Sequence, residues 1–423
     1  MPAREILTGS FQAALAAADP ISIVARHLPT PPRGRTVVVG AGKAAASMAF
    51  AVEQQWPAAM PLEGLVITRY GHGLPLERIR VIEAGHPVPD EQGQDAAREI
   101  LALARSLGED DLLLVLVSGG GSALLSLPAG GVSMADLKAV TRELLACGAP
   151  IQDMNTVRKH LSAIQGGRLA AATTARVLAL IISDVTGDDP THIGSGPCAA
   201  DPTTYRDALD VLARYGVKAP QSVSMHLEGG AQGRVPETPK PGDSALARAE
   251  NRVIATPHAS LVSAAAFVQH RGITPMVLGD SVTGESSEVA KVYAALARQV
   301  RTYGHPFKPP VALISGGETT VTLRGKGRGG RCTEFLLALA VALEGLAETW
   351  ALACDTDGID GSEDNAGAIL TPDALERAAG KGLSAKALLA NNDGYGFFCA
   401  LGELVVTGPT RTNVNDYRII LVR

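Results

Sequence analysis

Three glycine-rich breaks interrupt apolar runs in this sequence, each where a buried strand is expected to end. They read VVVGAGKAAA at 37–46, LVSGGGSALL at 116–125 and ALISGGETTV at 312–321. Glycine lets backbone N–H groups approach an anion closely, and a helix that starts just after a strand adds partial positive charge. The breaks therefore predict anion-binding loops, with a tight turn that only packs helix on sheet as the alternative. The predicted binding residues of the last two loops are Ser118, Gly119, Gly120, Gly121, Ser122, Ser315, Gly316, Gly317 and Glu318.

The first break combines a dinucleotide-like glycine pattern with a lysine. GAGKAA at 40–45 approaches the GxGxxG/A fingerprint, but the acidic residue expected about 20 positions on is missing, and the next strand ends at Thr68 and Arg69. An arginine there suits a phosphorylated nicotinamide cofactor, so a reductase stays open. Lys43 opposes the dipole of the following helix, which predicts an anion bound at Gly42 and Lys43. The alternative is a solvated surface lysine.

Two acidic loops also follow expected strands. IISDVTGDDPTHIGSGP at 181–197 and ACDTDGIDGSEDNAGA at 353–368 carry seven aspartates without compensating lysines. Such carboxylates repel one another unless a cation or a proton transfer accounts for them, and Mg²⁺ takes a few carboxylates together with phosphate oxygens. Asx-turns and helix caps explain one or two of these residues at most. The predicted metal ligands are Asp184, Asp189, Asp355 and Asp357.

Basic residues on glycine-containing segments match these acids. NTVRKHLSAIQGGRLA at 155–170 predicts anion binding by Asn155, Arg158 and Lys159, and LRGKGRGGRCTEF at 323–335 predicts it by Arg328 and Arg331. An exposed loop without function is the alternative. Lysine and arginine to neutralise charge, a divalent cation and a carboxylate that accepts a hydroxyl proton are the parts that phosphoryl transfer needs.

The elements that must position these residues follow an α/β pattern. Continuous apolar runs at 36–40, 64–68, 79–84, 112–118 and 177–183 are typical of parallel strands covered on both faces by helices. Helical patterns alternate with them, which predicts a doubly wound α/β domain. A polar, Pro-rich stretch near 235–248 precedes a second series, with strands expected at 251–256, 274–279, 311–315, 319–323, 349–354, 403–407 and 417–423. The predicted domains are 1–240 and 241–423.

Composition narrows the class of protein. The chain has 423 residues, a net charge of −5 and 4% aromatic residues, which argues against a nucleic-acid partner. Five scattered cysteines and an N-terminus without a continuous apolar leader predict reduced thiols in the cytoplasm. No run approaches the roughly 18 apolar residues of a membrane span, so no membrane partner is expected. The nine histidines form no zinc-ligand spacing.

Taken together, these stretches resemble the glycerate 2-kinase family, the second class of glycerate kinases, whose C-terminal part is the MOFRL domain. The resemblance runs in one order over nearly the whole chain. Besides the segments quoted above it is carried by RYGHG at 69–73, AGHPVPD at 84–90 and VVTGPTRTNVND at 405–416. It implies ATP- and Mg²⁺-dependent phosphorylation of D-glycerate at the 2-hydroxyl. It also implies a Rossmann-like N-terminal domain, a smaller α/β C-terminal domain and an active site in the cleft between them.

The resemblance also implies roles for single residues. Lys43 matches the lysine of GAGKA and would stabilise phosphate charge, and Arg331 matches the arginine of GGR and would hold the substrate carboxylate or the phosphoryl group. Asp189 and Asp355 would act as metal ligand and base, and which aspartate has which role is left open. Cys332 stands where relatives commonly carry Asn, and Gly394 where Ser is common. The first change predicts altered specificity or thiol sensitivity, with a small buried residue as the alternative.

Three functions stay open at this point. Relatives are often labelled hydroxypyruvate reductases because of their place in tartrate-utilisation operons, so an NAD(P)H-dependent reductase is the runner-up. A regulator that keeps the fold without catalysis is the third, although the charged residues it would lose are all present. The acidic loops favour the kinase, because hydride transfer needs neither carboxylate cluster. The assembly is left open, a homodimer included.

Overall fold

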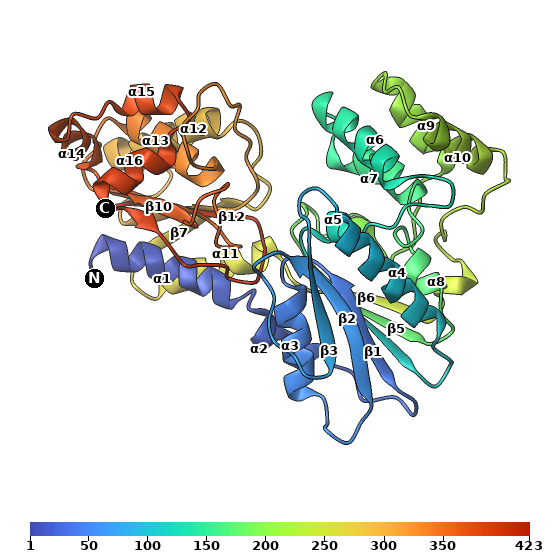
Figure 1. Cartoon of the computed structure of the whole chain (residues 1–423). Coiled ribbons are helices and arrows are strands. Elements are labelled where there is room, and N and C mark those ends of the chain that lie inside the picture. Colours follow the sequence, from blue (N-terminus) through green and yellow to red (C-terminus); the bar gives the residue numbers. More distant parts are fainter. The chain divides into compact units, whose positions relative to one another are not determined.

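The computed structural model describes all 423 residues, and the chain forms two compact units. Pro20–Ile254 make up one, called here the middle unit. Met1–Asp19 and Ala255–Arg423 make up the other, called the terminal unit because it contains both chain ends (Figure 1).

The middle unit is built on a six-stranded sheet in the order β3-β2-β1-β4-β5-β6. The pairs β3–β2, β2–β1, β1–β4 and β4–β5 are parallel. Every residue of β1 and β4 is buried, as expected for strands covered on both faces. The doubly wound order reverses direction between β1 and β4, which confirms the α/β prediction. The strands are β1 Thr36–Ala41, β2 Leu62–Arg69, β3 Ile79–Ala84, β4 Leu112–Val117, β5 Arg176–Ile182 and β6 Ala249–Ala255.

Helices of the middle unit fall into two groups. The first group packs with the sheet directly, except for α2, which packs on α3. It comprises α2 Pro20–Val24, α3 Ala45–Gln55, α4 Glu91–Arg105, α5 Gly121–Leu124 and α8 Arg168–Ala171. The second group has an apolar core of its own and stands beyond the carboxyl ends of the strands (Figure 1). It comprises α6 Met134–Ala146, α7 Ile151–His160, α9 Tyr205–Arg214 and α10 Gln221–Ala231.

The terminal unit holds a mixed sheet in the order β11-β10-β9-β12-β8-β7. β7 and β8 are parallel, whereas β12 runs antiparallel to both β8 and β9. Two apolar cores, one with α1 and α11 and one with α12 and α13, enclose it. Its strands are β7 Thr274–Gly279, β8 Val311–Ser315, β9 Thr349–Asp355, β10 Gly367–Leu370, β11 Leu404–Val405 and β12 Asp416–Val422. Its helices are α1 Ala3–Ala16, α11 Pro257–Gln269, α12 Ser286–Tyr303, α13 Arg331–Leu343, α14 Ala374–Gly380, α15 Ala385–Ala390 and α16 Gly394–Leu401.

The unit boundaries differ from the expected division at 240. β6 is the edge strand beside β5, so the sequence up to Ile254 belongs to the middle unit. α1 belongs to the terminal unit because it packs on α11, where the Ser263 hydroxyl donates to the Ala13 carbonyl at 2.9 Å. The strand expected at 319–323 is also absent, since only Thr320 forms an isolated bridge there.

One apolar stretch, Ala3–His27, is long and apolar enough to cross a membrane by those two criteria. It is not one helix in the structure, because α1, α2 and the 3₁₀ turn Ala25–His27 divide it. α1 buries Ile6, Leu7 and Phe11 in the core of the terminal unit. This burial is that of a core helix.

Candidate functional site

The first two glycine breaks meet at the carboxyl ends of β1 and β4, the point where open α/β sheets bind ligands. Lys43 N donates to Gly119 O at 2.8 Å, and Ala44 N donates to Ser118 Oγ at 3.0 Å. Gly42 has φ +144°, and a Cβ there would lie 2.1 Å from Ser118 Oγ. Glycine at 42 therefore lets the two loops approach each other.

The first break does not present its amides to an anion, which differs from the sequence expectation for Gly42. The N–H of Gly42 donates to Ile67 O at 3.1 Å, and the next two amides are bound as just described. At this break the structure matches the alternative interpretation, a tight turn that packs the helix on the sheet. A dinucleotide pyrophosphate would need these same N–H groups.

The second glycine break, residues 118–122, has backbone N–H groups without a hydrogen-bond partner. The N–H groups of Gly119 and Gly120 make no hydrogen bond in the chain. Gly120 has φ +83°, and a Cβ there would lie 3.5 Å from Lys43 Cγ and 2.9 Å from His86 Nε2. The Lys43 side chain therefore lies beside two unbonded backbone donors. We call Lys43 with residues 118–122 the glycine-loop site.

A polar network extends this site towards α7. Ser122 Oγ and Ser195 Oγ are 2.8 Å apart, and Ser195 Oγ donates to Asn155 Oδ1 at 3.1 Å. Asn155 Oδ1 also accepts from Arg158 Nη1 at 2.9 Å, while its Nδ2 donates to His192 O at 3.3 Å. Desolvation lowers the pKa of Arg158 to about 10. Predicted residues Ser122, Asn155 and Arg158 are thus brought together.

Lys159 is not part of the site, contrary to the sequence prediction. Its ammonium forms an ion pair with Asp201 at 2.8 Å, and the two side chains are 1% and 0% exposed. His160 Nε2 lies 3.8 Å from the same carboxylate. Lys159 and Arg158 are neighbours on α7, so their side chains leave the helix about 100° apart. One faces the site and the other the interior.

The first acidic loop contributes a charged group. Asp189 Oδ1 accepts from Thr191 N at 2.8 Å. Partial burial alone would raise the pKa of Asp189, but the hydrogen bonds from Thr191 and the nearby His192 and Lys159 lower it below its usual value. Asp189 is therefore ionised at neutral pH. Asp184 is partly buried at the start of the same loop.

In the terminal unit, Arg331 is surrounded by carboxylates. Its Nε donates to Asp416 Oδ1 and its Nη2 to Asp355 Oδ2, both at 2.7 Å, while Nη1 lies 3.0 Å from Glu318 Oε1. Burial disfavours the charged form, yet these three carboxylates outweigh it and raise the pKa of Arg331. Each guanidinium nitrogen faces a carboxylate, so a substrate anion competes with these carboxylates for Arg331. Glu318 is the exposed one, at 55%.

A second arginine completes this group. Arg418 Nη2 donates to Asp416 Oδ2 at 2.5 Å and to Thr319 Oγ1 at 3.0 Å, and its Nη1 donates to Gly316 O at 2.9 Å. We call Arg331, Glu318, Asp355, Asp416 and Arg418 the arginine cluster. The sequence prediction missed Asp416 and Arg418. Their signal was VVTGPTRTNVND, whose final aspartate begins β12.

The third glycine break is closely packed at Ser315, Gly316 and Gly317, and the anion site predicted there stays a prediction. Ser315 is fully buried, and Gly316 N donates to Gly279 O at 2.9 Å. Gly317 has φ +95°, and a Cβ there would lie 2.3 Å from the backbone of Val282. Three residues of this loop contact the arginine cluster: Glu318 through Arg331, and Gly316 and Thr319 through Arg418.

The second acidic loop is bound to its own backbone. Asp355 Oδ1 accepts from Asp357 N at 3.0 Å, and Asp357 Oδ1 accepts from Ile359 N at 2.9 Å. Asp360 accepts from the N–H groups of Cys332 and Thr333, which caps α13. No group of three or more His, Cys, Asp or Glu side chains that could hold a metal ion is present in the chain. A metal site here must use fewer protein ligands.

The arginine-rich arm at 321–330 is anchored away from Arg331. The Arg328 guanidinium lies 4.7 Å from the Tyr395 ring centroid and 3.5 Å from Glu363. Asn392 Oδ1 accepts from Arg324 N at 2.7 Å, and its Nδ2 donates to Glu334 Oε1 at 3.1 Å. Burial raises the pKa of Glu334 to about 7, against the effect of that hydrogen bond.

Two family models match the chain in sequence order. One is the domain of unknown function DUF4147, over residues 6–228, and the other is the MOFRL family, over residues 311–416. A glycerate 2-kinase of Pyrococcus horikoshii is 38% identical over 92% of this chain and 88% of its own length. The crystal structure of a Thermotoga maritima glycerate kinase matches with a TM-score of 0.87 and 37% identity, over 98% of both chains. This chain belongs to the glycerate 2-kinase family.

Other relatives in the family carry a different name. A protein of Agrobacterium vitis, provisionally named a hydroxypyruvate reductase, is 52% identical over 99% of this chain and 94% of its own length. The two names attach to chains of one fold. A choice between them must therefore come from the chemistry of the site.

Two departures from the usual family pattern have structural explanations. Cys332 is fully buried on α13, and burial raises the pKa of its thiol well above the usual value, so it is a small buried residue and not a reactive thiol. A Cβ at Gly394 would lie 2.8 Å from the Thr333 carbonyl carbon. Glycine is needed there for the close approach of α16 to α13.

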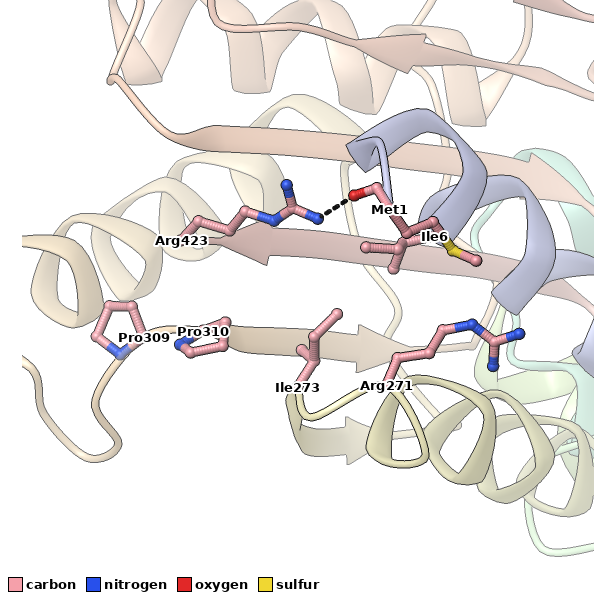
Figure 2. A pocket seen from close by; sticks show the side chains of 7 residues that line it. All are labelled: Met1, Ile6, Arg271, Ile273, Pro309, Pro310 and Arg423. Carbon is pink, nitrogen blue, oxygen red and sulfur yellow. Dashed lines mark hydrogen bonds between the residues drawn. The ribbon is translucent and has the colours of Figure 1, made fainter.

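A separate cavity of ≈ 370 Å³ lies in the terminal unit, and Figure 2 shows the residues that line it. It adjoins the start of β8 and the end of β12, where Arg423 Nη2 donates to Met1 O at 2.9 Å. The arginine cluster uses the other ends of both strands. No predicted site residue lines this cavity.

Proposed function

We propose that the protein transfers the γ-phosphoryl group of ATP to the 2-hydroxyl of D-glycerate, giving 2-phosphoglycerate and ADP. One observation carries the proposal: Lys43 lies beside the unbonded N–H groups of Gly119 and Gly120 at the carboxyl ends of β1 and β4. This is a preformed set of donors for phosphate oxygens. The names of the Pyrococcus and Thermotoga relatives support the same reaction.

The chemistry needs charge neutralisation more than covalent help. The 2-hydroxyl gives its proton to a carboxylate, for which Asp355 is the candidate, as its oxygen bonds to the γ-phosphorus. The bond from that phosphorus to the β–γ bridging oxygen breaks, and ADP leaves with the electron pair. The ammonium of Lys43 and the two amides stabilise the charge on the phosphoryl oxygens. Such contacts commonly contribute about 3–4 kcal/mol each to the transition state.

Mg²⁺ fits the residues of the first acidic loop. Mg²⁺ is usually held by one or two carboxylates together with substrate phosphates, so a site of three protein ligands is not required. The lowered pKa of Asp189 suits a charged ligand better than a base. We assign Asp189, with Asp184, to the cation, which would neutralise phosphate charge. Asp355, held by Arg331, remains the candidate base.

Arg331 is proposed to receive the glycerate carboxylate. Its fork geometry matches a carboxylate, and Glu318 occupies the outward-facing nitrogen until substrate replaces it. Asp355 and Asp416 keep the guanidinium in position throughout.

A reductase is the second candidate, because of the Agrobacterium names and the strand order of the middle unit. The bound amides of Gly42, Lys43 and Ala44 weigh against it, since the dinucleotide pyrophosphate needs donors at that turn. We further propose a cytoplasmic location from the scattered cysteines of the sequence.

The test measures ADP release from Mg-ATP with and without D-glycerate, and NMR then locates the phosphate on the product. Glycerate-dependent ADP with phosphate on the 2-hydroxyl is the expected result. The contrary result is no turnover with glycerate, together with oxidation of NAD(P)H by hydroxypyruvate. That outcome would assign the reductase.

A further inference from the structure

A cavity of ≈ 180 Å³ opens in the middle unit directly beside the glycine-loop site. One wall is the segment 87–89, which follows β3, and the opposite wall is α6, with Leu137, Thr141 and Leu145. Ser122 and Ala123 of α5 close the end nearest the glycine loop. Most of the lining surface is apolar. Of the site residues predicted from the sequence, only Ser122 and Arg158 line this cavity.

Side chains at the rim are apolar and unusually exposed. Val88 is 60% exposed and Leu145 is 61% exposed, on opposite walls. Two large apolar side chains that face a shared cavity without covering each other leave room for a flat apolar group between them.

The charged side chains that line the cavity are all positive. Lys138 and Arg142 of α6 and Arg158 of α7 line it, and none of the three forms an ion pair in the chain. The charge of Lys138 helps to lower the pKa of Asp90, an effect that acts without a direct bond. An apolar slot with three cations suits a ligand that is flat and apolar at one end and polyanionic at the other.

The size and position of the cavity narrow the class of ligand that it can hold. Pockets that enclose a whole drug-sized molecule measure roughly 300–1,000 Å³. At ≈ 180 Å³ this cavity takes one part of such a molecule. The unbonded N–H groups of Gly119 and Gly120 lie within three residues of Ser122, so the anionic part has donors next door.

We propose that this cavity holds the base of the nucleotide, clamped between the 87–89 segment and α6. Lys138, Arg142 and Arg158 lie along its phosphates as these run towards Lys43 and the glycine loop. The inference rests on the proposed kinase function, because it names where that reaction's nucleotide binds.

The first test is photolabelling of the full-length protein with 8-azido-ATP. The expected label lies in peptides that cover residues 83–90 or 134–147, and excess ATP prevents it. A label that ATP prevents but that maps elsewhere overturns the inference. The readout is independent of turnover. Label in the cavity from a protein that forms no ADP with glycerate would therefore reject the glycerate kinase assignment and keep the nucleotide site.

The second test uses two surface variants, Val88→Asp and Leu145→Asp. Each puts a carboxylate against the base and removes apolar contact, so KM for ATP should rise about tenfold or more. KM for D-glycerate should stay within about twofold of the parent value. Met225→Asp, on α10 and 63% exposed, is the matched control and should leave both unchanged. Unchanged KM for ATP in both cavity variants, with activity intact, overturns this inference alone.

A third comparison tests the orientation of the nucleotide. The double variant Lys138→Ala/Arg142→Ala removes charge and leaves the apolar walls. Its dissociation constant for ATP should rise about tenfold at low salt, and that for adenosine should stay within about twofold of the parent value. Equal weakening of both, or of neither, would contradict phosphates lying along α6.

Discussion

In the middle unit, Lys43 stands beside two backbone N–H groups without a hydrogen-bond partner, whereas in the terminal unit every guanidinium nitrogen of Arg331 already faces a carboxylate. Both groups sit at the ends of buried strands, and both were predicted from the sequence as anion sites. The first offers unbonded backbone donors beside a lysine to an incoming phosphate. The second is a preassembled ion-pair network in which an anion must compete.

This difference separates two kinds of contribution to function. Backbone N–H groups without a hydrogen-bond partner cost stability in the free protein, and this cost is recovered when a bound ligand accepts their hydrogen bonds. A cation held by Asp355 and Asp416 is instead fixed in place before the substrate arrives. Removing Lys43 should therefore damage catalysis and spare the fold, while removing Arg331 should damage both.

The largest expected effect is that of Lys43→Ala on turnover. Loss of a preorganised positive group at the phosphoryl oxygens should lower kcat about 10²–10³-fold. The free energy of unfolding should change by no more than about 1 kcal/mol, because the side chain is partly exposed. Steady-state kinetics and urea unfolding measure the two quantities. Large destabilisation with modest loss of kcat would reverse the contrast with Arg331.

Arg331→Ala is expected to lower stability by about 3 kcal/mol, the low end for broken buried pairs, because Arg331 itself is 25% exposed. The cause is that Asp355 and Asp416 would be left buried without this cation. Urea unfolding measures the loss. Arg331→Ala combined with Asp355→Asn should recover part of it, since one of the two buried carboxylates that lose this cation is then neutral, whereas Asp416 keeps its ion pair with Arg418. No recovery in the double variant would argue against charge as the cause.

The same α13 that carries Arg331 also carries an acid, Glu334, whose burial outweighs the hydrogen bond from Asn392 and the nearby charge of Arg324. Burial raises the pKa of Glu334 to about 7, well above the value of an unfolded chain. Between about pH 4.5 and 7 the unfolded chain releases this proton while the folded protein keeps it, so stability falls as pH rises through that window. The cost should reach roughly 3 kcal/mol above pH 7. Urea unfolding from pH 5 to 8 should show this slope, and Glu334→Gln should remove it.

Much of the fold of the middle unit could be predicted from the sequence, because local patterns determine it. The buried strands of the middle unit and the position of its glycine loops follow from continuous apolar runs that end in glycine. Which strands pair with each other could not be predicted from the sequence. The run at 251–256 was rightly expected to be a strand, but nothing local says that it pairs with β5 and so moves the domain boundary.

Side-chain direction was the second gap. Arg158 and Lys159 look equivalent in NTVRKH, and only the packing of α7 turns one towards Asn155 and the other onto buried Asp201. Asp416 was missed for a related reason. A single acid before a strand gives no spacing signal, and its pairing with Arg331 spans 85 positions of the chain.

The smallest effect, and the sharpest test of the contrast, is expected for Glu318→Gln. Glu318 is 55% exposed, so its ion pair with Arg331 should contribute no more than about 1 kcal/mol to stability. If Glu318 occupies the nitrogen that glycerate uses, the variant should bind glycerate about two- to fivefold more tightly, since one competing charge is gone. Steady-state kinetics should show the lower KM with kcat little changed. Asp373→Asn, on an exposed carboxylate 3.9 Å from Arg377, is the matched control. A raised KM in Glu318→Gln would instead mean that the carboxylate itself assists substrate binding, and that the arginine cluster works as a complete network.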